Sequence, residues 1–201
     1  MRNSKGFTLV ELAVVLVIIG IILGAVIKGQ DLVDNARAKQ FTNNIKTWQI
    51  ALTAYYDRKG TYPGDTDKNG IIGDVDADDI KTDLTNAKLT SIPTTNTFTL
   101  GQNTYYLYIG NGGTNAPKVI QICVDNACAN TFNDEARKMA ESLDTSLETS
   151  ADATITNVYG VTTTGTITDA NWKVNGAGTK ATVVDWLDST SEIKGIVYVL
   201  P

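Results

Sequence analysis

The longest hydrophobic run of the chain extends from residue 7 to residue 27 and contains one charged residue, Glu11. These 21 residues, as a helix, are about 32 Å long, which matches the ~30 Å hydrocarbon core of a bilayer. The pattern therefore predicts a single membrane-spanning helix. A carboxylate within hydrocarbon costs roughly 2.5–3.5 kcal/mol, so Glu11 is a candidate functional residue. The alternative is a transmembrane helix that tolerates a glutamate near one end.

Beyond this run the pattern changes to that of an amphipathic helix. Hydrophobic residues recur at spacings of 4, 3, 4 and 3, which places them on one helical face. They are Phe41, Ile45, Trp48, Leu52 and Tyr55. We expect the membrane helix to continue, with one apolar face, over residues 28–59. Gly60, followed by Pro63 and Gly64, ends the predicted helix.

The remaining chain alternates between strand-like and helix-like segments. Runs rich in Tyr, Ile, Val and Thr, separated by turns that contain Gly or Asp, predict strands. The predicted strands are residues 104–109, 119–124, 154–161, 166–174, 181–187 and 193–200. A helical pattern covers residues 133–147. The predicted fold class is α+β: a long N-terminal helix packed on a mostly antiparallel β-sheet, with one further helix and a calcium-type loop.

A short basic segment, which carries Arg2 and Lys5, precedes the apolar run. Positive residues mark the cytoplasmic side of a membrane helix, so the N-terminus is expected in the cytoplasm and the rest of the chain outside. A secretory signal would have a shorter apolar core, of about 7–15 residues, followed by a small-residue cleavage site. No such site follows residue 27. Any processing site is therefore expected before the apolar run.

The leader ends in Lys5-Gly6 and is followed directly by Phe7-Thr8-Leu9-Val10-Glu11 and the apolar helix. This combination resembles the precursors of type IV pilins and of the pseudopilins of type II secretion systems. The resemblance implies that a prepilin peptidase cleaves between Gly6 and Phe7 and methylates the new amino group of Phe7. It also implies that Glu11 pairs with the Phe7 amine of a neighbouring subunit. Such a pair would make both charges tolerable in hydrocarbon and fix the register between helices.

The resemblance also implies a function and a domain organisation. The chain would be a structural subunit of a type IV pilus or related homo-oligomeric filament, held in the inner membrane before assembly and extracellular or periplasmic afterwards. Its parts would be a leader, a transmembrane and polymerisation helix, an amphipathic continuation and an extracytoplasmic globular domain. They correspond to residues 1–6, 7–27, 28–59 and 60–201. The alternatives are a pseudopilin of a type II secretion system and a membrane-anchored binding module or adhesin that does not polymerise.

The apolar helix departs from many pilins because it lacks a late proline. Gly20 and Gly24 could soften it instead, since a helical glycine costs about 1 kcal/mol relative to alanine. The same two glycines could form a small-residue packing seam between helices. The sequence leaves both interpretations open.

An acidic segment after the long helix has the residue spacing of a calcium-binding loop. Oxygen-bearing residues occupy loop positions 1, 3, 5 and 12, and Gly70 occupies position 6, as in EF-hands of the dockerin type. The expected calcium ligands are Asp65, Asp67, Asn69, the carbonyl of Ile71, and Asp76. A short helix is expected to begin between residues 76 and 80 and to reach residue 89. The alternative is an unoccupied acidic turn.

Cys123 and Cys128 are the only cysteines of the chain. With two thiols and no histidine, a zinc site built from protein ligands is excluded. Outside the cytoplasm such a pair becomes oxidised, so a disulfide across a tight turn is expected. The alternative is two buried free thiols.

The composition offers little for catalysis or for nucleic-acid binding. Without histidine the chain lacks Ser-His-Asp and Cys-His arrangements, and we expect it not to be an enzyme. The neighbouring Asp78 and Asp79 are interpreted as solvated or calcium-related carboxylates, not as an acid–base pair. The net charge of −5 and the lack of a Lys/Arg cluster indicate no nucleic-acid surface.

Overall fold

The computed structural model describes residues 7–73, 75, 77–89, 92–111, 117–147, 157–176, 186 and 192–200. The chain divides into two compact units, residues 1–37 and 38–201.

The first unit contains the N-terminal part of α1 (Leu9–Lys59). Its aliphatic side chains from Leu9 to Val33 are exposed all around the helix. A helix that is apolar on every side requires a nonaqueous environment. In the described part of the chain, α1 is the one helix that is long and apolar enough to cross a membrane. The predicted N-terminal apolar helix is confirmed, and it fits a membrane anchor.

In the second unit, the remaining turns of α1 bury the predicted stripe. All five residues of the stripe are buried, Phe41, Ile45 and Leu52 completely. The Phe41 ring packs edge-on against Tyr105, with 4.9 Å between ring centroids. As predicted, α1 ends before Gly60, whose φ of +76° favours glycine.

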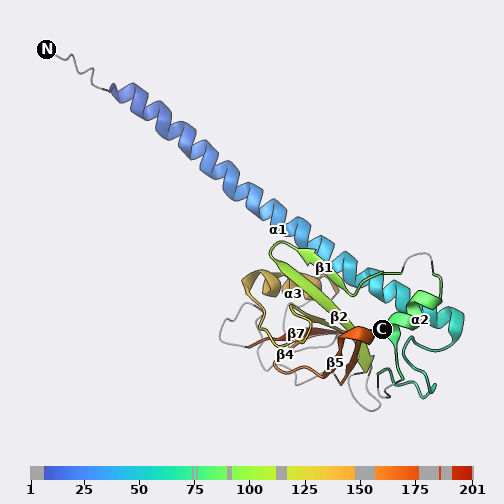
Figure 1. The fold of residues 1–201 in the computed structure, drawn as a ribbon. Helices are drawn as coiled ribbons and strands as arrows, with labels where there is room; N and C mark the ends of the chain where they lie inside the picture. The colour runs from blue at the N-terminus through green and yellow to red at the C-terminus, as the bar shows by residue number, and fades with distance from the viewer. Residues whose placement is uncertain are drawn as a thin grey trace. The chain divides into compact units, whose positions relative to one another are not determined.

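Among the described residues, the sheet of the second unit has seven strands in the order β4-β7-β3-β2-β6-β5, and β1 also pairs with β2. Figure 1 shows β1 and β2 as neighbouring strands. The strands are β1 (Thr97–Leu100), β2 (Asn103–Asn111), β3 (Lys118–Cys123), β4 (Val158–Val161), β5 (Thr166–Thr168), β6 (Lys173–Asn175) and β7 (Gly195–Val199). Every pairing is antiparallel except that of β2 with β6. The predicted α+β class and the mostly antiparallel sheet are confirmed.

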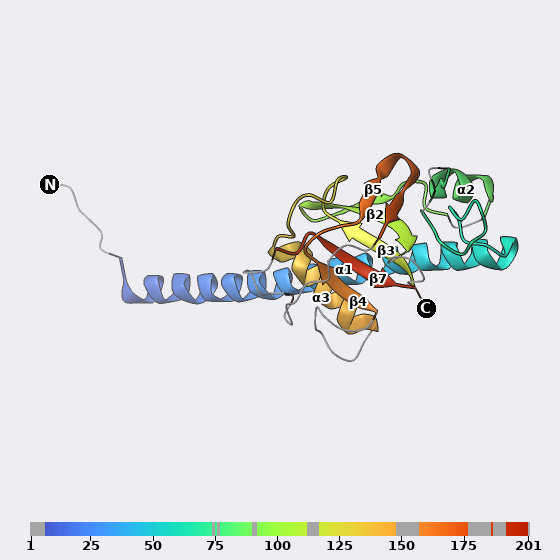
Figure 2. The ribbon, with the colours of Figure 1, turned by 90° about the horizontal axis from the view of Figure 1, so that it is seen from below.

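One face of this sheet carries the main hydrophobic core. Tyr105, Leu107 and Ile109 alternate along β2 and pack with α1 and with α3 (Asp134–Leu147). Figure 2 shows α3 and the later turns of α1 running along the sheet. The opposite face of the sheet holds smaller clusters, such as that of Tyr108 with Val174.

Most of the segments predicted from a local residue pattern agree with the structure. Residues 104–109, 119–124 and 193–200 correspond to β2, β3 and β7, and residues 133–147 to α3. The strand predicted at 154–161 is shorter, since β4 begins at residue 158; residues 154–156 lie outside the described part. Of the strand predicted at 181–187, Trp186 alone is described, in a turn.

Two predicted boundaries are wrong. Residues 166–174 form two antiparallel strands, β5 and β6, separated by the 3-10 turn η1 (Asp169–Asn171), because Trp172 adopts a left-handed φ of 57° and reverses the chain. The short helix α2 (Ile80–Asn86) ends before residue 89, since Lys88 has a φ of 50°. Besides α1, the described residues form two α-helices. The strand β1 was not predicted, although its alternating Thr and apolar residues before Gly101 are typical of a strand.

Candidate functional site

The start of α1 forms a capping box between Thr8 and Glu11. The Thr8 N–H and hydroxyl each donate to Glu11 Oε2 at 2.8 Å, and the Glu11 N–H donates to Thr8 Oγ1 at 3.3 Å. This reciprocal pattern satisfies two backbone donors that a helix start leaves unpaired. It explains locally why the helix begins at Leu9.

The capping box leaves the second oxygen of Glu11 open. Both bonds from Thr8 to the Glu11 side chain use Oε2, and Oε1 accepts no hydrogen bond from any described residue. Phe7, which precedes the box, is 80% exposed. Gly6, on the other side of the expected cleavage site, lies outside the described residues. The structure therefore presents an apolar helix whose first turn carries one oriented, accessible carboxylate.

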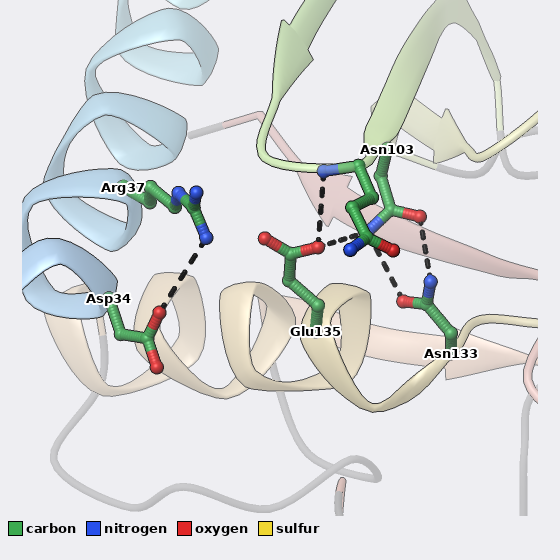
Figure 3. A network of polar contacts seen from close by, with 6 residues as sticks. Asp34, Arg37, Asn103, Asn133 and Glu135 are labelled. Atoms are coloured by element: carbon green, nitrogen blue, oxygen red, sulfur yellow. Dashed lines mark hydrogen bonds and ion pairs between the residues drawn. The ribbon is translucent and has the colours of Figure 1, made fainter. Parts of the chain in front are cut away.

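Gly20 and Gly24 lie within α1 without interrupting it. A Cβ atom added at either position would meet no atom within 4 Å. Neither glycine is therefore required by a neighbour within the chain, and both sequence interpretations, softening and packing seam, remain predictions. Further along, Asp34 and Arg37 form an exposed ion pair at 3.7 Å (Figure 3), a type that contributes little stability.

The acidic loop after α1 brings Asp65, Asp67 and Asn69 together. Asp65 Oδ2 accepts the Gly70 N–H at 3.2 Å, and Asp67 Oδ2 accepts the Asn69 Nδ2 amide at 2.8 Å. Asn69 Oδ1 accepts the Ile71 N–H at 2.7 Å. Positive φ angles at residues 68 and 70 produce this tight path. Three of the predicted ligand side chains are thus neighbours.

Burial changes the pKa of Asp65, the first carboxylate of the loop. It raises the pKa of the Asp65 carboxyl above its usual value, although the N–H groups of Gly70 and Asn69 act in the opposite direction. The negative charges of Asp67 and Asp78 raise this pKa further. Among the described residues, no group of three or more His, Cys, Asp or Glu could hold a metal, and Asp76 lies outside them. The calcium ligand set stays a prediction.

Asp78 has a role that the sequence interpretation missed. It is fully buried and accepts backbone N–H groups from Thr66 at 3.1 Å, Gly73 at 2.9 Å and Val75 at 3.2 Å. Its neighbour Asp79 caps α2 by accepting the Thr82 N–H. Of the two interpretations, solvated or calcium-related, the solvated one is therefore wrong for Asp78, and the calcium-related one stays a prediction. The position of Asp79 directly before Ile80 was a usable N-cap signal. The sequence carried no signal for the three hydrogen bonds that Asp78 accepts from the folded loop.

Cys123 and Cys128 form the predicted disulfide, which excludes the free-thiol alternative. The turn that it closes is organised by the Asp125 carboxylate, which accepts the N–H groups of Ala127 at 2.8 Å and Asn130 at 2.7 Å. The bridge holds the end of β3, where Cys123 is buried.

A polar network that sequence reasoning missed connects the β1–β2 turn to the start of α3 (Figure 3). Glu135 Oε2 accepts from the Gln102 N–H at 3.3 Å and from Asn103 Nδ2 at 3.1 Å. The amides of Asn103 and Asn133 exchange two hydrogen bonds. An added Cβ at Gly101 would collide with the Glu135 carboxylate. The network stabilises the fold around the sheet.

Comparison with known proteins gives one match. Residues 1–27 match the family model described as the prokaryotic N-terminal methylation motif, the hallmark of type IV pilin and pseudopilin precursors. The match includes Gly6, Phe7 and Glu11. No curated protein and no solved structure matches the chain.

Proposed function

We propose that this chain, whose residues 1–27 carry the methylation motif of type IV pilin and pseudopilin precursors, is a structural filament subunit. A prepilin peptidase would cleave between Gly6 and Phe7 and methylate the new amine. Removal of Arg2 and Lys5 takes the formal net charge from −5 to −7. The mature subunit would polymerise through its apolar helix into a homo-oligomeric filament, without enzymatic activity.

The observation that carries this proposal is the geometry of Glu11. Thr8 holds one carboxylate oxygen, which leaves Oε1 open toward the surroundings of the helix. The α-amine of a neighbouring chain is a suitable partner, because an ammonium and a carboxylate that meet in hydrocarbon each relieve the other's desolvation. One such pair per subunit fixes how far one helix is displaced along the next.

The second unit suits the outside of such a filament. Its sheet, the buried stripe of α1 and the Cys123–Cys128 bridge give a domain with its own core. A disulfide is expected where the domain has left the cytoplasm. We assign the inner membrane as the location before assembly, with the N-terminus on the cytoplasmic side.

Glutamine and alanine at position 11 separate the pairing role from the capping role. Glu11→Gln keeps an oxygen for the Thr8 N–H, since glutamine also serves in capping boxes, but it has no charge. Glu11→Ala loses both. We expect both variants to insert into the membrane and neither to form ordered filaments, as seen by electron microscopy with antibodies against the chain. Asp34→Asn, the same charge change beyond the apolar run, should assemble normally.

The outcomes distinguish the alternatives. Normal filaments from Glu11→Gln would refute the charge pairing, and normal filaments from both variants would refute the assembly role. Filaments restricted to the periplasm of secreting cells would identify a pseudopilin. A wild-type chain that reaches the membrane in its native host and never enters filaments would favour an anchored binding module.

A further inference from the structure

A buried carboxylate oxygen without a partner lies at the start of the acidic loop. Asp65 is 8% exposed, and its Oδ1 accepts no hydrogen bond from any described residue. Its other oxygen bonds to the Gly70 N–H across the loop, which directs the carboxylate into the loop. A buried ionised oxygen in this position is unfavourable unless a cation or a proton meets it.

The oxygen has suitable neighbours for a cation. Asp67 is exposed and close enough to raise the pKa of Asp65 by its charge. Asn69 connects to Asp67 through its side-chain amide. A site of carboxylate, amide and backbone carbonyl oxygens, without nitrogen or sulfur, suits a hard cation. Calcium accepts such irregular sets of 6–8 oxygens, whereas magnesium requires near-ideal octahedral geometry and retains most of its water.

We propose that residues 65–71 form a structural calcium site in which the unpartnered Oδ1 of Asp65 is the anchoring ligand. Asp67, Asn69 and the carbonyl of Ile71 supply further oxygens, and water completes the sphere. The Asn69 amide rotates on binding so that its oxygen faces the ion. This site does not depend on the polymerisation proposed above.

Asp78 is the scaffold of the site and not a ligand. Its carboxylate accepts the Thr66 N–H on one side of the loop and the N–H groups of Gly73 and Val75 on the other. These bonds hold the two ends of the loop together in the absence of an ion. Substitution of Asp65 and substitution of Asp78 should therefore change thermal stability in different ways, although both residues are buried aspartates of one loop.

The segment that contains the loop lies between α1 and α2 in the chain and bonds to two strands of the sheet, so an ion there would stabilise more than a surface turn. The Ile72 N–H donates to Asn111 Oδ1 of β2 at 2.7 Å. The Lys173 ammonium of β6 donates to the Val75 carbonyl at 2.8 Å. Ile72 is almost completely buried in the main core. An ion that holds residues 65–71 thus reinforces the attachment of this segment to the paired strands β2 and β6.

Thermal unfolding of the full-length protein in detergent, with calcium chloride or with a chelator, tests the site. For extracellular modules with Kd of about 10⁻⁴–10⁻³ M, about 10 mM calcium lowers the unfolding equilibrium constant roughly 10- to 100-fold. This raises the Tm of the wild type by about 3 °C or more. Magnesium at the same concentration should have a smaller effect.

Four variants decide between site and scaffold. Asp65→Asn, which keeps the side-chain shape, should lose the calcium response and be at least as stable as wild type in chelator. Asp78→Asn should lower the Tm in chelator as well as in calcium. Asp67→Ala, at an exposed position, should lower the Tm only in calcium. Asp57→Asn, an exposed aspartate of α1, should respond as the wild type does.

Two results would overturn the proposal. One is an identical Tm of the wild type in calcium and in chelator. The other is a calcium response of Asp65→Asn equal to that of the wild type, which indicates surface screening only. Either result leaves the filament proposal intact, and failed assembly of a calcium-responsive chain would affect the filament proposal alone.

Discussion

Truncation of Phe41 tests how α1 is held on the sheet. Phe41 is completely buried and packs edge-on against Phe98 at 5.7 Å and Tyr105 at 4.9 Å between ring centroids. Phe→Ala in a closed core typically costs about 3–5 kcal/mol, because the lost burial and the remaining cavity add. With two aromatic partners, we expect Phe41→Ala to lower the free energy of unfolding by about 4 kcal/mol.

Ile50 of the same helix provides the matched control. It is 62% exposed, so Ile50→Ala should change stability by no more than about 0.5 kcal/mol. The assay is guanidinium unfolding of the full chain in detergent, followed by tryptophan fluorescence. Trp48 packs against Trp172 in the same core and reports its loss. Equal denaturant slopes for both variants would establish that stability alone has changed.

Two results would contradict this role of Phe41. A cost below about 1 kcal/mol for Phe41→Ala would mean that α1 is not anchored through this stripe. A similar cost for Ile50→Ala would mean that the exposed face of α1 is buried in the protein as it exists in solution.

Two further predictions concern the disulfide and the pH dependence of stability. Reduction of the bridge should lower the free energy of unfolding by about 2 kcal/mol, because the closed loop is short (sequence separation 5). The double variant Cys123→Ser and Cys128→Ser should have the same effect. A loss above about 4 kcal/mol in denaturant titrations would contradict this expectation. Burial raises the pKa of Asp65, so in chelator its stabilising contribution is present below its usual pKa of about 3.9 and is lost as the pH rises through the raised value. The wild type should therefore lose stability relative to Asp65→Asn as the pH rises above the usual carboxyl pKa and through the raised one, and a difference independent of pH would refute this assignment.

Local patterns were sufficient for much of the fold. The apolar run, the stripe from Phe41 to Tyr55, and the strands β2 and β3 each depend on the periodicity of neighbouring residues. The disulfide followed from the compartment and from two cysteines five positions apart. In each case the decisive physics lies within a few residues of the chain.

Contacts between distant residues could not be predicted from one sequence. The bonds of Glu135 to the β1–β2 turn cross more than 30 positions. Asp78 looked like a solvated carboxylate because its three N–H partners are brought together only by the folded loop. The run at 166–174 has strand-like residues throughout, yet the left-handed Trp172 divides it. The capping box at Thr8 and Glu11 had a local signal, a threonine three residues before a glutamate.

The most direct test of the filament proposal is the intact mass and the N-terminal sequence of the chain isolated from filaments of its native host. The proposal predicts a chain that begins at Phe7 with a methylated amine and lacks residues 1–6. Mature protein that retains Met1–Gly6, or filaments that do not contain this chain, would contradict it.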